Sequence, residues 1–88
     1  MSNAPYLTAD ATVSARKAVA VTPSDTVDLA AGPTRGLYVG AFGNVTVDMV
    51  SGGTGIVFVG VQPGSLLPIQ ATRVYATGTT ATSIVALY

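Results

Sequence analysis

The stretch Val45-Thr46-Val47-Asp48-Met49 decides the fold, because apolar and polar side chains alternate in it at every step. Strict alternation places successive side chains on opposite faces of a β-strand, so one face of this strand is buried and the other is polar. A glycine-containing turn at residues 51–54 follows, and the next stretch, Ile56-Val57-Phe58-Val59-Gly60-Val61, is apolar on both sides. Together they predict a β-hairpin whose second strand is covered on both faces, by the core and by something else.

Short runs rich in Val, Thr, Ile and aromatic residues, separated by Gly and Pro, continue through the chain from residue 17. The further strands that we expect are residues 17–22, 26–29, 36–41, 65–69, 72–77 and 82–87. Hairpin turns are expected at Gly43-Asn44 and at residues 78–80, and a type II turn at Pro63-Gly64. About eight short strands with short links predict an all-β fold: a small, mainly antiparallel β-sandwich or barrel.

The first 16 residues differ from the rest of the chain, because they are rich in Ala, Ser and Thr and contain Pro5. We predict an extended N-terminal arm at residues 1–16 and a β-sandwich or barrel domain at residues 17–88. A basic segment followed by an apolar run, which would mark a secretory signal, is not visible. No apolar stretch approaches the roughly 20 residues that span a bilayer, so we expect no membrane partner.

Charge is scarce in this chain. Four Asp and four Lys or Arg make up 9% of its residues, against about 25% in an ordinary globular protein, while 49% of the residues are hydrophobic. A surface of Thr, Ser, Gly and Ala with scattered Val is cheap to desolvate, which favours burial against other protein. With no Cys and no His, this small domain lacks disulfides and the commonest metal ligands. Association with other subunits is therefore the remaining source of additional stability for the fold. A Thr-rich, weakly charged monomer is the alternative.

The titratable groups predict no catalytic, cofactor-binding or metal site. A nucleophilic Ser or Thr needs an adjacent base, and the chain has no His and a single Lys. Asp25 and Asp28 flank a turn and fall short of a calcium-binding loop. The glycines at residues 36–43 match neither a phosphate loop nor a dinucleotide fingerprint. Four dispersed cations form no basic stripe, so we expect no nucleic-acid partner.

Arginine and tyrosine provide the candidate interface residues. Arg35 and Arg73 each begin a strand in otherwise uncharged sequence, where Arg suits pairing with a carboxylate such as Asp28 or Asp48, in the same or a neighbouring subunit. The alternative for both is a solvated strand end. Tyrosines are either rings at the edge of the core or interface anchors. The candidate residues of a subunit or capsid interface are Tyr6, Leu7, Arg16, Lys17, Arg35, Tyr38, Arg73 and Tyr88.

Four segments carry a resemblance to a known family. They are Ala20-Val21-Thr22-Pro23-Ser24-Asp25, Thr34-Arg35-Gly36-Leu37-Tyr38-Val39-Gly40, Pro63-Gly64-Ser65-Leu66-Leu67-Pro68-Ile69 and Ala76-Thr77-Gly78-Thr79-Thr80-Ala81-Thr82. In this order they resemble the small head-spike base or capsid decoration proteins of gene transfer agents and tailed phages. The resemblance covers roughly residues 19–88 and brings no catalytic motif.

The resemblance implies a non-enzymatic virion structural protein on the capsid exterior, made in the cytoplasm of a bacterial host. The implied partners are the major capsid protein, further copies of the chain and, for a spike base, a spike or fibre protein. A spike base implies a pentamer at fivefold vertices, and a decoration (cement) protein implies a trimer at threefold positions. The competing hypothesis is a receptor- or carbohydrate-binding β-domain of a tail fibre, which the lack of Trp and His disfavours.

Overall fold

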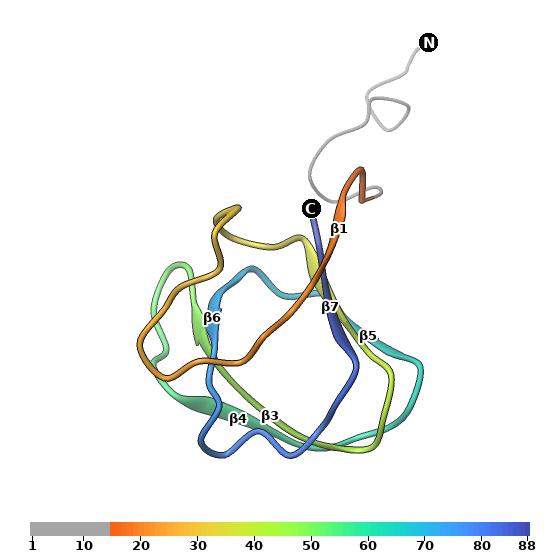
Figure 1. Ribbon diagram of the computed structural model, residues 1–88. Helices are drawn as coiled ribbons and strands as arrows, with labels where there is room; N and C mark the ends of the chain where they lie inside the picture. Colours follow the sequence, from red (N-terminus) through yellow and green to blue (C-terminus); the bar gives the residue numbers. More distant parts are fainter. Residues whose placement is uncertain (1–14) are drawn as a thin grey trace, which may run out of the picture.

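A computed structural model describes residues 15–88, which form seven β-strands in two sheets (Figure 1). The strands are β1 (Ala18–Ala20), β2 (Gly36–Val39), β3 (Gly43–Met49), β4 (Ile56–Val61), β5 (Ser65–Leu67), β6 (Ala71–Val74) and β7 (Ile84–Leu87). One sheet has the order β1-β7-β2-β5 and the other β4-β3-β6, and every pairing is antiparallel. The prediction of an all-β, mainly antiparallel sandwich or barrel is therefore confirmed, and the two separate sheets make it a sandwich.

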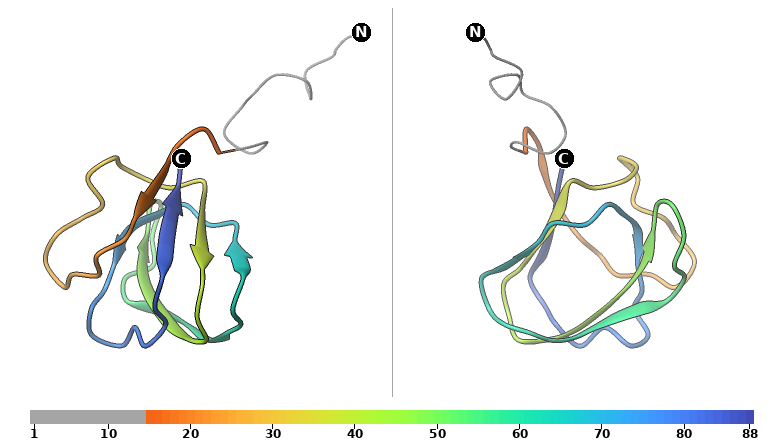
Figure 2. Two further views of the ribbon diagram at one scale, coloured as in Figure 1. Left: turned by 45° about the vertical axis from the view of Figure 1, so that its right-hand side comes forward. Right: turned by 180° about the vertical axis from the view of Figure 1, so that it is seen from behind.

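The two sheets lie face to face as two layers (Figure 2). Alternation determines which side chains fill the space between them: Val45 and Val47 of β3 are fully buried, as are Leu37 and Val39 of β2. Ala86 of β7 stands opposite Leu37 and is buried with it. The core is therefore made of small aliphatic side chains. No helix in residues 15–88 is long and apolar enough to cross a membrane.

The hairpin predicted from the alternating stretch is present. β3 pairs with β4 in antiparallel register, and the backbone amide of Met49 donates to the carbonyl of Gly53 at 2.9 Å across the turn. The turn at Pro63-Gly64 is also confirmed. Ser65 N donates to Gln62 O at 3.2 Å, and Gly64 has φ +78°, the conformation that the third position of a type II turn requires.

The hairpins predicted at residues 43–44 and 78–80 are wrong, because both links cross from one sheet to the other. β2 pairs with β5 and β7 and not with β3, whereas β6 pairs with β3 and not with β7. Gly43 has a different role from a turn residue: a Cβ on it would collide with the backbone of Ala81, which passes directly beside it. The glycine is therefore needed for close approach of two crossing segments.

The strand predicted at residues 26–29 is absent, which is why residues 15–88 form seven strands and not about eight. The segment does lie beside β6, because Leu29 N donates to Thr72 O at 2.8 Å and Ser24 N donates to Val74 O at 2.9 Å. Between these two bonds the Ser24 hydroxyl accepts the Val27 amide at 3.2 Å, which turns the backbone away from an extended conformation.

Two leucines test the inward and outward assignment of the first sheet. Leu37 is fully buried, whereas Leu66 is 57% exposed on a neighbouring strand. Leu37→Ala should lower the free energy of unfolding by about 2–5 kcal/mol, because it leaves a cavity in the core. Leu66→Ala, the matched control, should change it by no more than about 0.5 kcal/mol. Urea denaturation measures both, and equal losses would contradict the assignment.

Candidate assembly surfaces

The outer face of the β1-β7-β2-β5 sheet is apolar and uncharged. Tyr38 stands opposite Val85 on one side and Leu66 on the other, and residues directly opposite each other share a face of the sheet. Tyr38 is 42% exposed, and its phenol is the one polar side-chain group of this face. The uncharged face consists of Ala18, Ala20, Gly36, Tyr38, Leu66, Val85 and Leu87.

The outer face of the β4-β3-β6 sheet has the opposite character where β3 meets β6. Asp48 stands opposite Arg73, and the Tyr75 hydroxyl donates to the Asp48 carboxylate at 2.9 Å. This hydrogen bond, together with burial, raises the pKa of Tyr75 above its ordinary value. Arg73 Nε donates to Asp28 Oδ1 at 2.7 Å, which makes an ion pair within the subunit. The charges of this face are thus engaged within the subunit.

The segment formed by residues 22–31 is fastened to this charged side. Asp25 Oδ1 accepts the backbone amides of Ala76 and Thr77 at 3.0 and 2.8 Å, and Asp25 Oδ2 accepts the Thr77 hydroxyl at 2.6 Å. Arg73 adds a hydrogen bond to the carbonyl of Asp25 at 3.2 Å. These contacts attach the segment to the β6 side of the sandwich, although it directly follows β1 of the other sheet.

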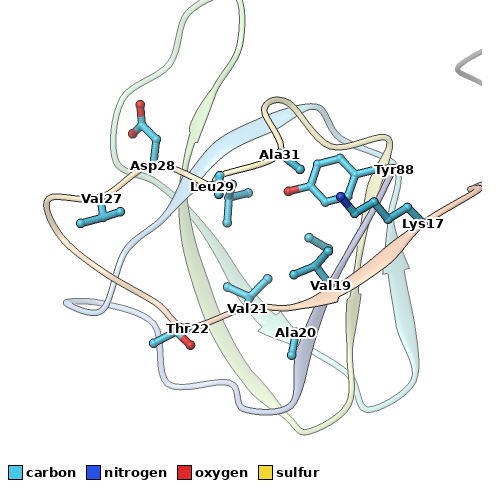
Figure 3. Close-up of a pocket in the computed structure, with 12 residues that line it drawn as sticks. Lys17, Val19, Ala20, Val21, Thr22, Val27, Asp28, Leu29, Ala31 and Tyr88 are labelled. Carbon is cyan, nitrogen blue, oxygen red and sulfur yellow. The ribbon is translucent and has the colours of Figure 1, made fainter.

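A groove of about 380 Å³ lies between β1 and the fastened segment, and we call it the β1 groove (Figure 3). Its apolar lining comes from Val19, Val21, Val27, Leu29, Ala31 and Ala86. At one end Lys17 lies beside the ring of Tyr88 (Figure 3). No group of three His, Cys, Asp or Glu side chains that could hold a metal ion is found in residues 15–88.

The structure brings some of the predicted interface residues together and separates others. Arg16 and Lys17 lie beside Tyr88, because both of their backbone amides donate to its carbonyl oxygen. Arg35 shares a second, smaller hollow with Tyr88, of about 290 Å³. Tyr38 lies on the uncharged face. These five positions remain candidates for contact with another protein.

The remaining predicted interface residues lie elsewhere. Arg73 belongs to the opposite sheet, and its pairing with Asp28 is one that the sequence suggested. Tyr6 and Leu7 lie outside the described residues. Sequence reasoning missed Leu66 and Val85, because only the strand register shows that they flank Tyr38.

β4 presents a second exposed apolar surface. Val59 is 77% exposed and Val57 is 47% exposed, although both belong to the stretch that we expected to be covered on both faces. Within the subunit, the outer face of this strand is open. Its cover by another protein stays a prediction.

Comparison with solved structures shows a similarity to a capsid chain. A chain of the solved structure described as "Capsid of native GTA particle computed with C5 symmetry" (GTA, gene transfer agent) superposes on this chain with a TM-score of 0.80 and 33% sequence identity. The match covers 93% of each chain. No protein-family model matches the chain, and no curated protein matches it either.

The contacts of Asp25 predict how stability depends on pH. The Thr77 hydroxyl and amide that donate to this carboxylate hold the pKa of Asp25 below its ordinary value of 3.8. The resulting stabilisation is complete above that value and is lost as the pH falls through the lower pKa of the folded protein. Wild type should therefore lose more stability than Asp25→Asn between about pH 5 and pH 2.5, as measured by thermal unfolding. An equal loss would show that Asp25 does not contribute.

Proposed function

We propose that this protein, which belongs to the same family as the gene transfer agent capsid chain, binds the capsid exterior. The premise is that it is a virion structural protein of a phage-like particle. There it acts as a decoration (cement) protein or as the base of a head spike or fibre. It works without catalysis, by contact with the major capsid protein and with copies of itself.

The uncharged face is the observation that supports this proposal. Burying apolar surface yields roughly 25 cal/mol per Å², and no charge has to be desolvated when this face is covered. Tyr38 lies within it, flanked by Val85 and Leu66, and a partly exposed Tyr surrounded by apolar side chains is typical of an interface anchor. We therefore assign the shell contact to the uncharged face.

Binding of this kind would stabilise the particle by mass action. A protein that binds the assembled shell and not its separated subunits adds stability that grows with its concentration over its dissociation constant. A decoration protein needs nothing more. A spike base needs in addition a surface for the spike, for which the exposed valines of β4, on the opposite sheet, are available.

The copy number distinguishes these two roles. A ring of five suits a fivefold vertex and a spike base, and the related chain was solved in a particle computed with C5 symmetry. A trimer suits a decoration protein at threefold positions. The receptor-binding alternative expects a groove with polar and aromatic lining, whereas the β1 groove is lined mainly by aliphatic side chains.

The shell contact can be tested with purified protein and preassembled heads that lack it. The wild-type protein should co-sediment with these heads, and protein added from outside reaches only the exterior. Tyr38→Asp should weaken binding by at least about tenfold, because a carboxylate would have to be buried in an apolar contact. The matched control Val59→Asp changes a more exposed residue on the other sheet and should bind like wild type.

Two outcomes would overturn the proposal. If wild-type protein does not bind heads, attachment to the exterior is wrong. If Val59→Asp abolishes binding and Tyr38→Asp does not, the shell contact lies on the β4 side. Native mass spectrometry of the bound protein, released from heads, then gives three or five copies.

A further inference from the structure

β1 is a sheet edge whose outer hydrogen-bonding groups have no strand beside them in residues 15–88. Its neighbour on the other side is β7, with Val19 opposite Ala86. Tyr88 N donates to Lys17 O at 2.7 Å and Val21 N donates to Ile84 O at 2.9 Å. In an antiparallel pair the backbone groups of alternate residues point to opposite sides, so those of Ala18 and Ala20 point away from β7. An edge of this kind is a template for a further strand.

The β1 groove runs along this open edge. A strand added to β1 would therefore set every second side chain into the groove, against Val19 and Leu29. The other side chains of that strand would face outward. The occupant should consequently alternate between small apolar and polar residues.

Residues 7–14 have this pattern. Apolar side chains occupy every odd position and polar ones every even position, in the order Leu7, Thr8, Ala9, Asp10, Ala11, Thr12, Val13, Ser14. The apolar members are mostly small, and so are most side chains that line the groove. No segment of this chain before residue 15 other than this one alternates over eight positions.

We propose that residues 7–13 of a neighbouring copy of this chain add a strand to β1 and fill the β1 groove. The inference goes beyond the proposed attachment to a shell and does not depend on it, because only copies of this chain take part. It assigns an occupant to the groove and a mode of self-association to the protein.

A neighbouring copy fits better than the chain's own segment. To lie against its own β1, the segment would have to reverse direction in a tight turn immediately before Ala18. Residues 11–17 contain Ser14 but no Gly, Asn or Asp, the residues that two-residue hairpin turns use. A turn at Asp10 would pair the segment with residues before β1 and leave the open edge uncovered.

The link between donor and acceptor is short. From Val13 to Arg16 the chain spans at most about 10 Å, so the two copies must be in direct contact. An arm that enters a different surface on the next copy is a heterologous contact, and repetition of such a contact gives a ring where the rotation between copies closes and an open filament where it does not. The exchange therefore predicts an oligomer of repeated head-to-tail contacts, which is cyclic when the rotation closes.

Cross-linking tests the exchange directly, because the chain contains no Cys. Ala9→Cys and Val27→Cys are placed on two separately tagged full-length chains that are produced together. Mild oxidation should link the two chains in high yield. In the matched control, Ala9→Cys is combined with Val59→Cys, a more exposed position on the β4 side, and should link at least about fivefold less.

Two results would overturn the proposal: equal linking of Val27→Cys and Val59→Cys, or linking that occurs only when Ala9→Cys and Val27→Cys lie on the same chain. Neither depends on binding to heads, so failure of the exchange and failure of the shell contact are distinguishable.

Discussion

The fastening of residues 22–31 to the β6 side of the sandwich determines the surfaces on which the proposed assembly depends. Asp25 and the Arg73–Asp28 ion pair hold this segment away from β1, the strand that it directly follows. The segment therefore does not pair with the free side of β1. Because it does not, β1 keeps an open edge and an apolar groove lies beside it. The chain has few charged residues, and three of them, Asp25, Asp28 and Arg73, hold this segment against the β6 side.

The same use of charge makes the two outer faces unlike. Asp48, Arg73 and Tyr75 form contacts with one another or with the fastened segment on one sheet, whereas the outer face of the other sheet has no ionisable group except the phenol of Tyr38. A protein surface with few charges costs little to desolvate, and one that is also flat and apolar is suited to burial. The difference between the faces gives the subunit an orientation relative to anything that it binds.

Alternation and turn chemistry predicted the local structure well, because both depend on residues close together in the sequence. The β3–β4 hairpin and the turn at Pro63-Gly64 are examples. The links after β2 and β6 were predicted as hairpins and instead cross between the sheets, since the choice of partner strand depends on packing across the core and on close approaches such as that at Gly43. The uncharged face could not be predicted for the same reason: register alone places Leu66 beside Tyr38.

The composition of the uncharged face bears on how firmly one subunit can bind. Apart from Tyr38 and a few aliphatic side chains, this face is Ala and Gly, so the proposed contact would bury little apolar area per residue and a single copy would bind weakly. A larger apolar patch would favour aggregation of the unbound protein. Firm attachment then requires several copies joined to one another, since each further contact forms at the high effective concentration that the first one sets. Exchange of residues 7–13 between neighbours would join them, and so would turn a set of weak contacts into stable attachment.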